Sequence, residues 1–243
     1  MVYSVYDLKA FYASGPGRLV RRLVLEHIRG MWPDLKGLRL MGAGYTTPYL
    51  RGMMEGTERT FALMPAAGGV HFLPEREKGL VALSSEAEWP LETESVDRIL
   101  LVHSLENSAV PQALLQEAWR VLKSNGRLLL VVPNRLGLWA RADCTPFGRG
   151  IPFTAGQISQ YLADSLFVHE RTERALFMPP FRSFLVLRGA YAFESIGRAA
   201  FPGLAGIYLV EASKQIYAGV GRVRAERVPG RRILVGAPSP AGG

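Results

Sequence analysis

Short, mainly apolar runs alternate with amphipathic segments along most of the chain. The runs at 38–41, 99–102 and 128–132 are typical of strands buried on both faces of a parallel sheet. Over 16–31 and 111–122, apolar residues recur every three to four positions, which indicates helices that bury one face. Weaker patterns predict further strands at 59–64, 79–83, 166–177 and 206–217. They also predict helices at 4–12, 47–55, 154–162 and 181–199. This alternation predicts an α/β fold with a mostly parallel, doubly wound sheet and helices on both faces.

The first of these strands runs into a glycine turn. Gly42 and Gly44 follow the run 38–41, and Thr46-Thr47-Pro48 then starts a helix with a capping hydroxyl and a proline in its first turn. In this layout, backbone N–H groups and a helix N-terminus meet a ligand, and glycine lets the ligand reach the backbone. Because glycines also end many strands for steric reasons, the turn alone predicts a ligand loop only weakly.

Composition narrows the class of protein. With 243 residues, 48% of them hydrophobic, the chain can bury the core of one α/β domain. Its one cysteine, Cys144, excludes an internal disulfide framework and a cysteine-rich metal site. No apolar stretch approaches the roughly 20 residues that span a bilayer, and the start of the chain lacks a signal-peptide pattern. We therefore expect a cytoplasmic protein with no transmembrane segment.

The formal net charge of +8 is concentrated at the two ends of the chain. Residues 1–36 carry +3 and residues 214–243 carry +5, whereas the region between them is neutral. Basic ends favour anionic substrates, membranes or nucleic acid, although we prefer the simpler interpretation, which is a solvated basic rim. We predict an N-terminal helical cap at 1–36, an α/β domain at 37–217 and a basic C-terminal tail at 218–243.

Three segments between residues 38 and 133 resemble the class I S-adenosylmethionine (SAM)-dependent methyltransferases, and within them the type 11 methyltransferase domain. Residues 38–44 look like the glycine motif of that family. Residues 86–91 and 95–100 look like its acidic-Ala-x-Leu-Pro segment and the strand that follows, and 117–128 is similar to its helix-Arg-Val-Leu-Lys-Pro-Gly-Gly-strand element. The resemblance implies a seven-stranded sheet whose last strand is antiparallel, and SAM as the cofactor.

Several positions depart from the family pattern. Leu40 stands where an acid usually precedes the first glycine, and Thr46 stands where the third glycine would be. The second strand ends in Leu63-Met64-Pro65, without the acid that grips the ribose, and Ser85 replaces the usual aspartate near the adenine. Each charge-assisted hydrogen bond is worth about 1.5–3 kcal/mol, so the loss of two weakens binding roughly a hundredfold or more. We therefore expect SAM affinity in the micromolar range or weaker.

In an open α/β sheet, ligands bind beyond the carboxyl ends of the strands, where the strand order reverses. For the resembled fold this crevice lies between Met41 and His103. His103 is the candidate catalytic base for an oxygen or nitrogen acceptor, although a histidine at a strand end often only bonds nearby backbone. The resemblance places the cofactor on these residues: Gly42, Ala43, Gly44, Met64, Ser85, Glu86, Ala87, Trp89 and His103.

The irregular stretch 133–152 is long enough to suggest a function, and in the resembled fold it would cover the substrate side of the crevice. Its arginines and aromatic residues suit a planar or anionic substrate. The alternative is a packed lid whose aromatic side chains seal the core. Tyr12 is a further candidate for closing the crevice from the N-terminal side. The predicted substrate-binding residues are Asn107, Arg135, Trp139, Arg141 and Phe147.

Three functions fit these patterns. The first is a SAM-dependent methyltransferase acting on a small, anionic or aromatic acceptor. The second is a methyltransferase-like protein without catalysis that serves as a binding or regulatory module. The third is a nucleic-acid methyltransferase, which the basic charge favours; however, the chain has no Asn/Asp-Pro-Pro-aromatic tetrapeptide. No metal-ligand spacing is present.

Overall fold

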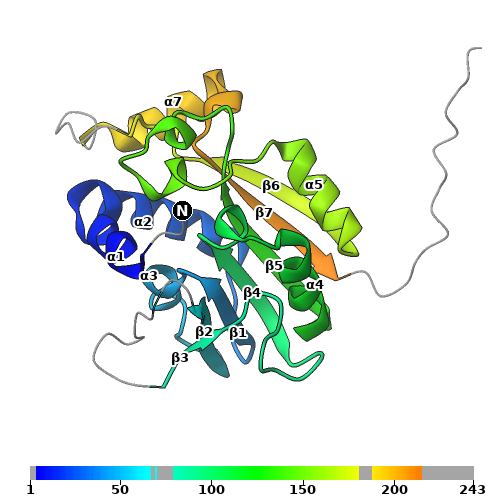
Figure 1. Ribbon diagram of the computed structural model, residues 1–243. Helices are drawn as coiled ribbons and strands as arrows, with labels where there is room; N and C mark the ends of the chain where they lie inside the picture. Colours follow the sequence, from blue (N-terminus) through cyan, green and yellow to red (C-terminus); the bar gives the residue numbers. More distant parts are fainter. Residues whose placement is uncertain (1–3, 67–68, 70–78, 181–187, 215–243) are drawn as a thin grey trace, which may run out of the picture.

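The computed structural model describes residues 4–66, 69, 79–180 and 188–214, and its centre is one seven-stranded sheet (Figure 1). The strand order is β3-β2-β1-β4-β5-β7-β6. The strands are β1 (Arg39–Gly44), β2 (Arg59–Pro65), β3 (Val81–Ser84), β4 (Val96–Val102), β5 (Leu122–Pro133), β6 (Phe167–Ala175) and β7 (Ile207–Lys214). Strands β3, β2, β1, β4 and β5 pair in parallel, whereas β7 is antiparallel to both β5 and β6. The predicted mostly parallel sheet with an antiparallel last strand is therefore confirmed.

Helices cover both faces of the sheet. They are α1 (Val5–Ala13), α2 (Gly15–Met31), α3 (Thr47–Leu50), α4 (Pro111–Val121), α5 (Ala155–Asp164) and α7 (Ala190–Ala200). Alternate residues of β4 point to opposite faces: Leu100 packs in the cluster that contains α2, and Leu101 packs in the cluster that contains α4 and α5. This two-sided burial explains why the central strands read as continuous apolar runs.

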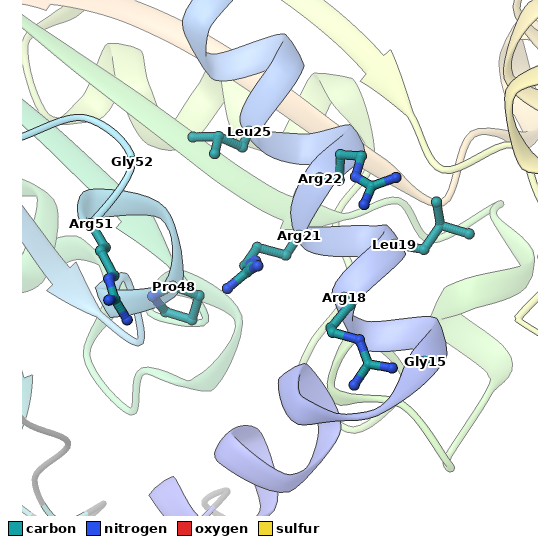
Figure 2. Close-up of a pocket in the computed structure, with 9 residues that line it drawn as sticks. All are labelled: Gly15, Arg18, Leu19, Arg21, Arg22, Leu25, Pro48, Arg51 and Gly52. Carbon is teal, nitrogen blue, oxygen red and sulfur yellow. The ribbon is translucent and has the colours of Figure 1, made fainter. Parts of the chain in front are cut away.

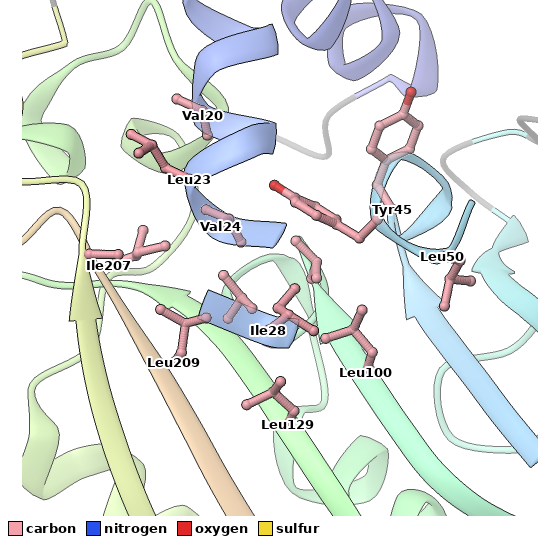
Figure 3. Packing of buried hydrophobic residues seen from close by; sticks show 14 of the residues in the cluster. Val20, Leu23, Val24, Ile28, Tyr45, Leu50, Leu100, Leu129, Ile207 and Leu209 are labelled. Carbon is pink, nitrogen blue, oxygen red and sulfur yellow. The ribbon is translucent and has the colours of Figure 1, made fainter. Parts of the chain in front are cut away.

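Helix α2 is the main element on the first face. It lies beside the segment that carries Pro48 and Arg51 (Figure 2), and its apolar face meets the sheet (Figure 3). Val24 and Ile28 are fully buried against strand residues such as Leu129. The opposite side of α2 carries its arginines, as the 3.6-residue period requires.

A tight turn folds α1 back onto α2. Ser14 caps α2 by accepting a hydrogen bond from the Gly17 backbone N–H at 3.2 Å, and its hydroxyl donates to the Phe11 carbonyl at 2.6 Å. A Cβ on Gly17 would lie 1.9 Å from the Phe11 oxygen, so only glycine allows this approach. The turn directs Tyr12 into the protein interior, where its side chain is buried.

Two local predictions were wrong. Helix α3 ends at Leu50 and not at residue 55, and the Thr46 hydroxyl does not cap it. Helix α4 ends at Val121 and continues directly into β5, so neither Asn125 nor Gly126 adopts the predicted left-handed cap. The reason lies in tertiary contacts, because backbone N–H groups of residues 94 and 95 donate to the carbonyls of residues 120 and 121.

Parts of other predictions lie outside the described residues. Of the helix expected at 181–199, the structure describes α7, and the basic tail at 218–243 is not described. The long stretch after β5 contains two short 3₁₀ helices, η3 (Leu138–Arg141) and η4 (Pro146–Gly148). The other 3₁₀ helices are η2 (Leu105–Asn107) and η5 (Pro202–Leu204). Among the described residues, no helix combines the length and apolar character needed to cross a bilayer.

Candidate active site

The glycine turn packs directly onto the neighbouring strand β4. Gly44 pairs with Val102 and has φ +82°, and the next N–H, that of Tyr45, donates to the Val102 carbonyl at 2.8 Å. A Cβ on Gly44 would lie 2.5 Å from the Val102 oxygen and 2.8 Å from the Ser104 Cβ. Glycine is therefore required here both by backbone conformation and by space.

A small cavity opens beside this turn, at the carboxyl ends of β1, β2 and β3. It has a volume of about 10 Å³, close to the minimum that holds one water molecule and far below the roughly 300 Å³ of a small ligand pocket. Six of the predicted cofactor-binding residues meet around it. Its lining consists of Ala43, Gly44, Leu63, Met64, Pro65, Ser84, Ser85, Glu86, Trp89, Ser104 and Leu114.

The segment that carries Glu86 and Trp89 is tied to α4. The Trp89 N–H donates to Glu117 at 2.8 Å, and Arg120 donates to the Trp89 carbonyl at 3.1 Å. The Glu86 carboxylate accepts a hydrogen bond from the Ser108 hydroxyl at 2.7 Å. These contacts fix one wall of the cavity. Ala87, which was predicted to contact the cofactor, does not line it.

Gly42 faces away from the cavity and is covered by Thr46. A Cβ on Gly42 would lie 2.0 Å from the Thr46 Oγ1 and 2.7 Å from a Leu50 methyl group. The Thr46 hydroxyl is itself fully buried and, within the described part of the chain, has no hydrogen-bond partner. A buried hydroxyl without a partner is rare in folded proteins, so the glycine turn retains one unused polar group.

His103 follows β4 and is the centre of a buried polar cluster. Its Nε2 lies 2.7 Å from the Tyr12 hydroxyl, and its Nδ1 lies 3.2 Å from Glu106 Oε1. The Tyr12 hydroxyl also lies 2.8 Å from that of Tyr49. One hydrogen-bond pattern satisfies all of them: Tyr49 donates to Tyr12, Tyr12 donates to Nε2, and Nδ1–H donates to Glu106.

Burial keeps the two phenols of this cluster protonated. It raises the pKa of the Tyr12 phenol well above its ordinary range, with Tyr49 adding to the effect, and it likewise raises the pKa of Tyr49. Both phenols therefore keep their protons at neutral pH and act as neutral donors. His103 is only 5% exposed and has φ +51°, a left-handed conformation that is uncommon outside glycine.

Glu106 is the acidic member of this cluster. Its carboxylate faces His103, and its second oxygen, Oε2, is buried without a partner among the described residues. Gly150 closes over it, because a Cβ there would lie 2.7 Å from the Glu106 Cγ. The signal in the sequence was its position three residues after His103, on the turn η2.

The predicted substrate-binding residues are only partly brought together. Asn107 donates to the His103 carbonyl at 3.3 Å, and the Phe147 ring centre lies 4.8 Å from that of His103. Trp139 is buried and donates to the Met178 carbonyl at 2.7 Å, so it holds the long loop to the core. Arg135 donates to the carbonyl of Pro152 within that loop, and Arg141 is exposed.

No group of three or more His, Cys, Asp or Glu side chains capable of holding a metal ion occurs in the described ranges. Cys144 is an exposed free thiol. The polar groups of the site include His103, the carboxylates of Glu86 and Glu106, and the phenols of Tyr12 and Tyr49.

The comparisons with known proteins agree with this architecture. Residues 41–130 match a family model described as methyltransferase domain. No curated protein sequence matches the chain. Among solved structures, a SAM-dependent methyltransferase from Archaeoglobus fulgidus is 19% identical, covering 87% of this chain and 100% of its own, with a TM-score of 0.61.

Two further structures show the same fold. A SAM-dependent methyltransferase from Thermotoga maritima is 15% identical and covers 87% of this chain and 96% of its own, with a TM-score of 0.61. A Haloferax volcanii protein assigned as a methyltransferase, solved in complex with the Trm112 methyltransferase activator, is 16% identical. It covers 88% of this chain and 100% of its own, with a TM-score of 0.64.

The protein thus has the fold of these SAM-dependent methyltransferases. The methyltransferase-domain match over residues 41–130 coincides with the segments whose motifs resemble that family.

The residues present fit one end of SAM better than the other. Met64 and Trp89 give apolar walls, and Ser85 and Glu86 give a polar edge, as an adenine ring requires. No carboxylate stands at Leu40 or at the end of β2. The cavity of about 10 Å³ does not hold the whole cofactor in this conformation. Binding therefore requires the crevice to open.

Proposed function

We propose that the protein is a SAM-dependent methyltransferase that acts on a small, aromatic or anionic acceptor. The observation that carries the proposal is the buried His103–Glu106 pair next to the glycine turn of a methyltransferase domain. SAM, when bound, supplies an electrophilic methyl group, so the protein needs no nucleophile of its own. Its residues must position the acceptor and, for an oxygen or nitrogen acceptor, remove a proton.

His103 has the geometry of a general base held in one tautomer. Glu106 accepts from Nδ1–H, which leaves Nε2 free to receive a proton. In the closed conformation, Tyr12 occupies that nitrogen with its hydroxyl. An acceptor hydroxyl that replaces the Tyr12 hydroxyl at Nε2 stands where its proton can be taken. The neighbouring Phe147 ring favours a flat acceptor.

The second candidate function is a methyltransferase-like module without catalysis. Two observations favour it: the missing carboxylates at Leu40 and at the end of β2, and the cavity of about 10 Å³. Both functions require the same fold, so they differ in whether the protein transfers a methyl group, and SAM binding is the first requirement for that transfer. A nucleic-acid acceptor remains the least supported of the three readings.

Calorimetric titration of the full chain with SAM separates the two functions. Under the enzyme proposal, binding is measurable with a dissociation constant in the micromolar range or weaker. Incubation with isotopically labelled SAM and a panel of phenols, amines and carboxylic acids then identifies the acceptor by label transfer. Absence of binding at millimolar SAM rejects the enzyme proposal and leaves the module as the better account.

A further inference from the structure

A second and much larger cleft lies on the outer side of the glycine turn, between α2 and the segment that follows α3 (Figure 2). Its volume is about 640 Å³, within the roughly 300–1,000 Å³ of small-ligand sites. It shares no lining residue with the cavity at the carboxyl ends of β1 to β3. Four arginines line it, namely Arg18, Arg21, Arg22 and Arg51.

Among the described residues, none of these four arginines forms an ion pair with a carboxylate, and no acidic residue lines the cleft. Arg22 hydrogen-bonds to the Tyr191 hydroxyl, which donates to Glu26. Arg18 and Arg22 are four positions apart on α2, so their charges repel each other. Figure 2 shows Arg21 and Arg51 reaching into the cleft from opposite walls. A multiply charged anion held between Arg21 and Arg51 lowers the electrostatic repulsion among the four positive charges of the cleft.

The walls of the cleft are held in place by contacts at its ends. Arg29, one turn beyond the cleft, donates from Nη2 to the Gly52 carbonyl at 2.7 Å. A Cβ on Gly52 would lie 2.9 Å from a Leu25 methyl group, so glycine permits this close approach. At the other end, the Arg18 guanidinium donates to the Ala13 carbonyl. The cleft therefore exists before any ligand arrives, which lowers the cost of binding.

We propose that this cleft binds a small molecule that carries a phosphate group attached to an apolar body. Guanidinium groups donate paired hydrogen bonds to phosphate oxygens, and Arg21 and Arg51 hold such a group from two sides. Leu25 and Pro48 provide the apolar surface for the rest of the ligand. A concave site of this size favours a small molecule over a nucleic-acid backbone, which needs an extended basic surface.

The position of the cleft connects its ligand to the first site through the short helix α3. Arg51 follows α3 directly, and α3 begins next to Thr46 in the glycine turn. Because Pro48 of α3 also lines the cleft, a ligand bound there contacts the same short helix whose Leu50 covers Gly42. The proposal does not depend on methyl transfer, because binding at the cleft can be measured without SAM.

The test is calorimetric titration of the full chain with phenyl phosphate, inorganic phosphate and phenol. We expect phenyl phosphate to bind more tightly than inorganic phosphate, and phenol not to bind. The double variant Arg21→Gln, Arg51→Gln should weaken phenyl phosphate binding about tenfold or more. The matched control is Arg174→Gln, an exposed arginine on β6 outside the cleft, which should leave affinity unchanged.

Thermal unfolding of each variant checks that it is folded. If the double variant is not folded, the single variant Arg51→Gln takes its place. Equal phenyl phosphate affinity in wild type and the folded arginine variant overturns the proposal, as does no binding at millimolar phenyl phosphate. Tighter binding of a single-stranded RNA oligonucleotide, weakened equally by Arg174→Gln, also overturns it in favour of a distributed nucleic-acid surface. SAM titration of the same samples tests the methyltransferase proposal separately.

Discussion

His103 combines three properties that cost stability. It is buried, it has a left-handed backbone conformation, and it lies beside a carboxylate of which one oxygen has no partner in the part of the chain that the structure describes. A β-region residue at this strand end would avoid the backbone cost, which is of order 1–3 kcal/mol. Strained polar residues of this kind cluster at functional sites, and this supports the proposed role of His103 as a base.

The substitution His103→Ala tests this role. Because His103 lies outside the lining of the small cavity and its loss frees Tyr12 from one hydrogen bond, we expect SAM affinity not to fall. Turnover should fall by about 10²–10⁴, the usual contribution of a general base. The measurement is label transfer to the acceptor found by the screen. His169→Ala, at an exposed histidine on β6, is the control and should retain full turnover. Equal turnover in both variants rejects His103 as the base.

Replacing glycine with alanine at two positions should change the unfolding free energy in opposite directions. Gly44→Ala places a Cβ 2.5 Å from a backbone oxygen at φ +82°, and we expect a loss of about 3 kcal/mol or more in unfolding free energy. Gly30→Ala, in the last turns of α2 with nothing within 4 Å of the new Cβ, should be neutral or gain about 0.5 kcal/mol. Urea unfolding measures both. A small effect at Gly44 would mean that the turn can move.

At the scale of single residues, the sequence patterns predicted His103 and the glycine turn but not which side chains form hydrogen bonds with His103. The glycines and the strand end are local features, which neighbouring residues reveal. Tyr12 meets His103 across 91 positions of the chain, and only the packing of α1 brings them together. Glu106 is close in sequence, but its direction depends on the loop that folds over it at Gly150.

Among the elements, α4 does more than cover the sheet. Glu117 accepts hydrogen bonds from Arg120 and from the Trp89 N–H, and Arg120 also donates to the Leu91 carbonyl. This explains physically why two separate family motifs occur together in the sequence. One motif supplies the helix, and the other supplies the cavity wall that the helix holds.

The substitution Glu117→Gln tests this connection through pH. Hydrogen bonds from Arg120 hold the pKa of Glu117 below its ordinary value, with the Trp89 N–H adding to the effect. A carboxylate with a lowered folded-state pKa contributes stability above its unfolded-state pKa of about 4.3 and loses it as pH falls through the folded-state pKa. At pH 7 the variant should lose about 1–3 kcal/mol.

Thermal unfolding of wild type and Glu117→Gln across a pH series measures this effect. The difference between the two proteins should shrink as pH falls below the unfolded-state pKa, and it should vanish below the folded-state pKa, where the wild-type carboxyl is protonated in both states. Gln112→Ala on the same helix is the control, and its effect should not vary over this range. A constant difference between wild type and Glu117→Gln at all pH values would exclude the ion pair as its cause.

Element boundaries show where sequence patterns fall short. The order of strands and helices follows from hydrophobic periodicity, and it was predicted correctly. The Lys123-Ser124-Asn125-Gly126 stretch is typical of a helix cap, yet it lies within β5. Its role changed because other chain segments satisfy the last carbonyls of α4, including Lys214 Nζ, which donates to the Leu122 carbonyl at 2.9 Å. Contacts of this kind leave no local signal.

For the whole molecule, the central question is how a cofactor enters a closed crevice. Helix α1 packs on α2, which is anchored to the sheet by a large apolar face (Figure 3). Helix α1 is short and contributes three buried residues, of which Tyr12 reaches His103. The least costly opening therefore moves α1, which breaks the Arg18 hydrogen bond to the Ala13 carbonyl, and leaves α2 in place.

If α1 must move to admit SAM, then a variant that loses a contact between α1 and the rest of the protein should bind SAM more tightly. If only a fraction of molecules is open, the apparent dissociation constant is the intrinsic constant divided by that fraction. Tyr12→Ala removes the hydrogen bonds to His103 and Tyr49 and the stacking on Tyr45. These contacts together are worth about 2–3 kcal/mol, so SAM should bind the variant at least about tenfold more tightly than wild type.

Calorimetry with SAM measures the change, and Ile158→Ala provides the control. Ile158 is buried on α5 against the opposite face of the sheet, so its loss destabilises the fold without releasing α1. SAM affinity should stay unchanged in this variant. Tighter binding in both variants would show that general loosening, and not the release of Tyr12, admits the cofactor. Unchanged affinity in Tyr12→Ala would place the barrier elsewhere, at Thr46 and Tyr45, which lie over the glycine turn itself.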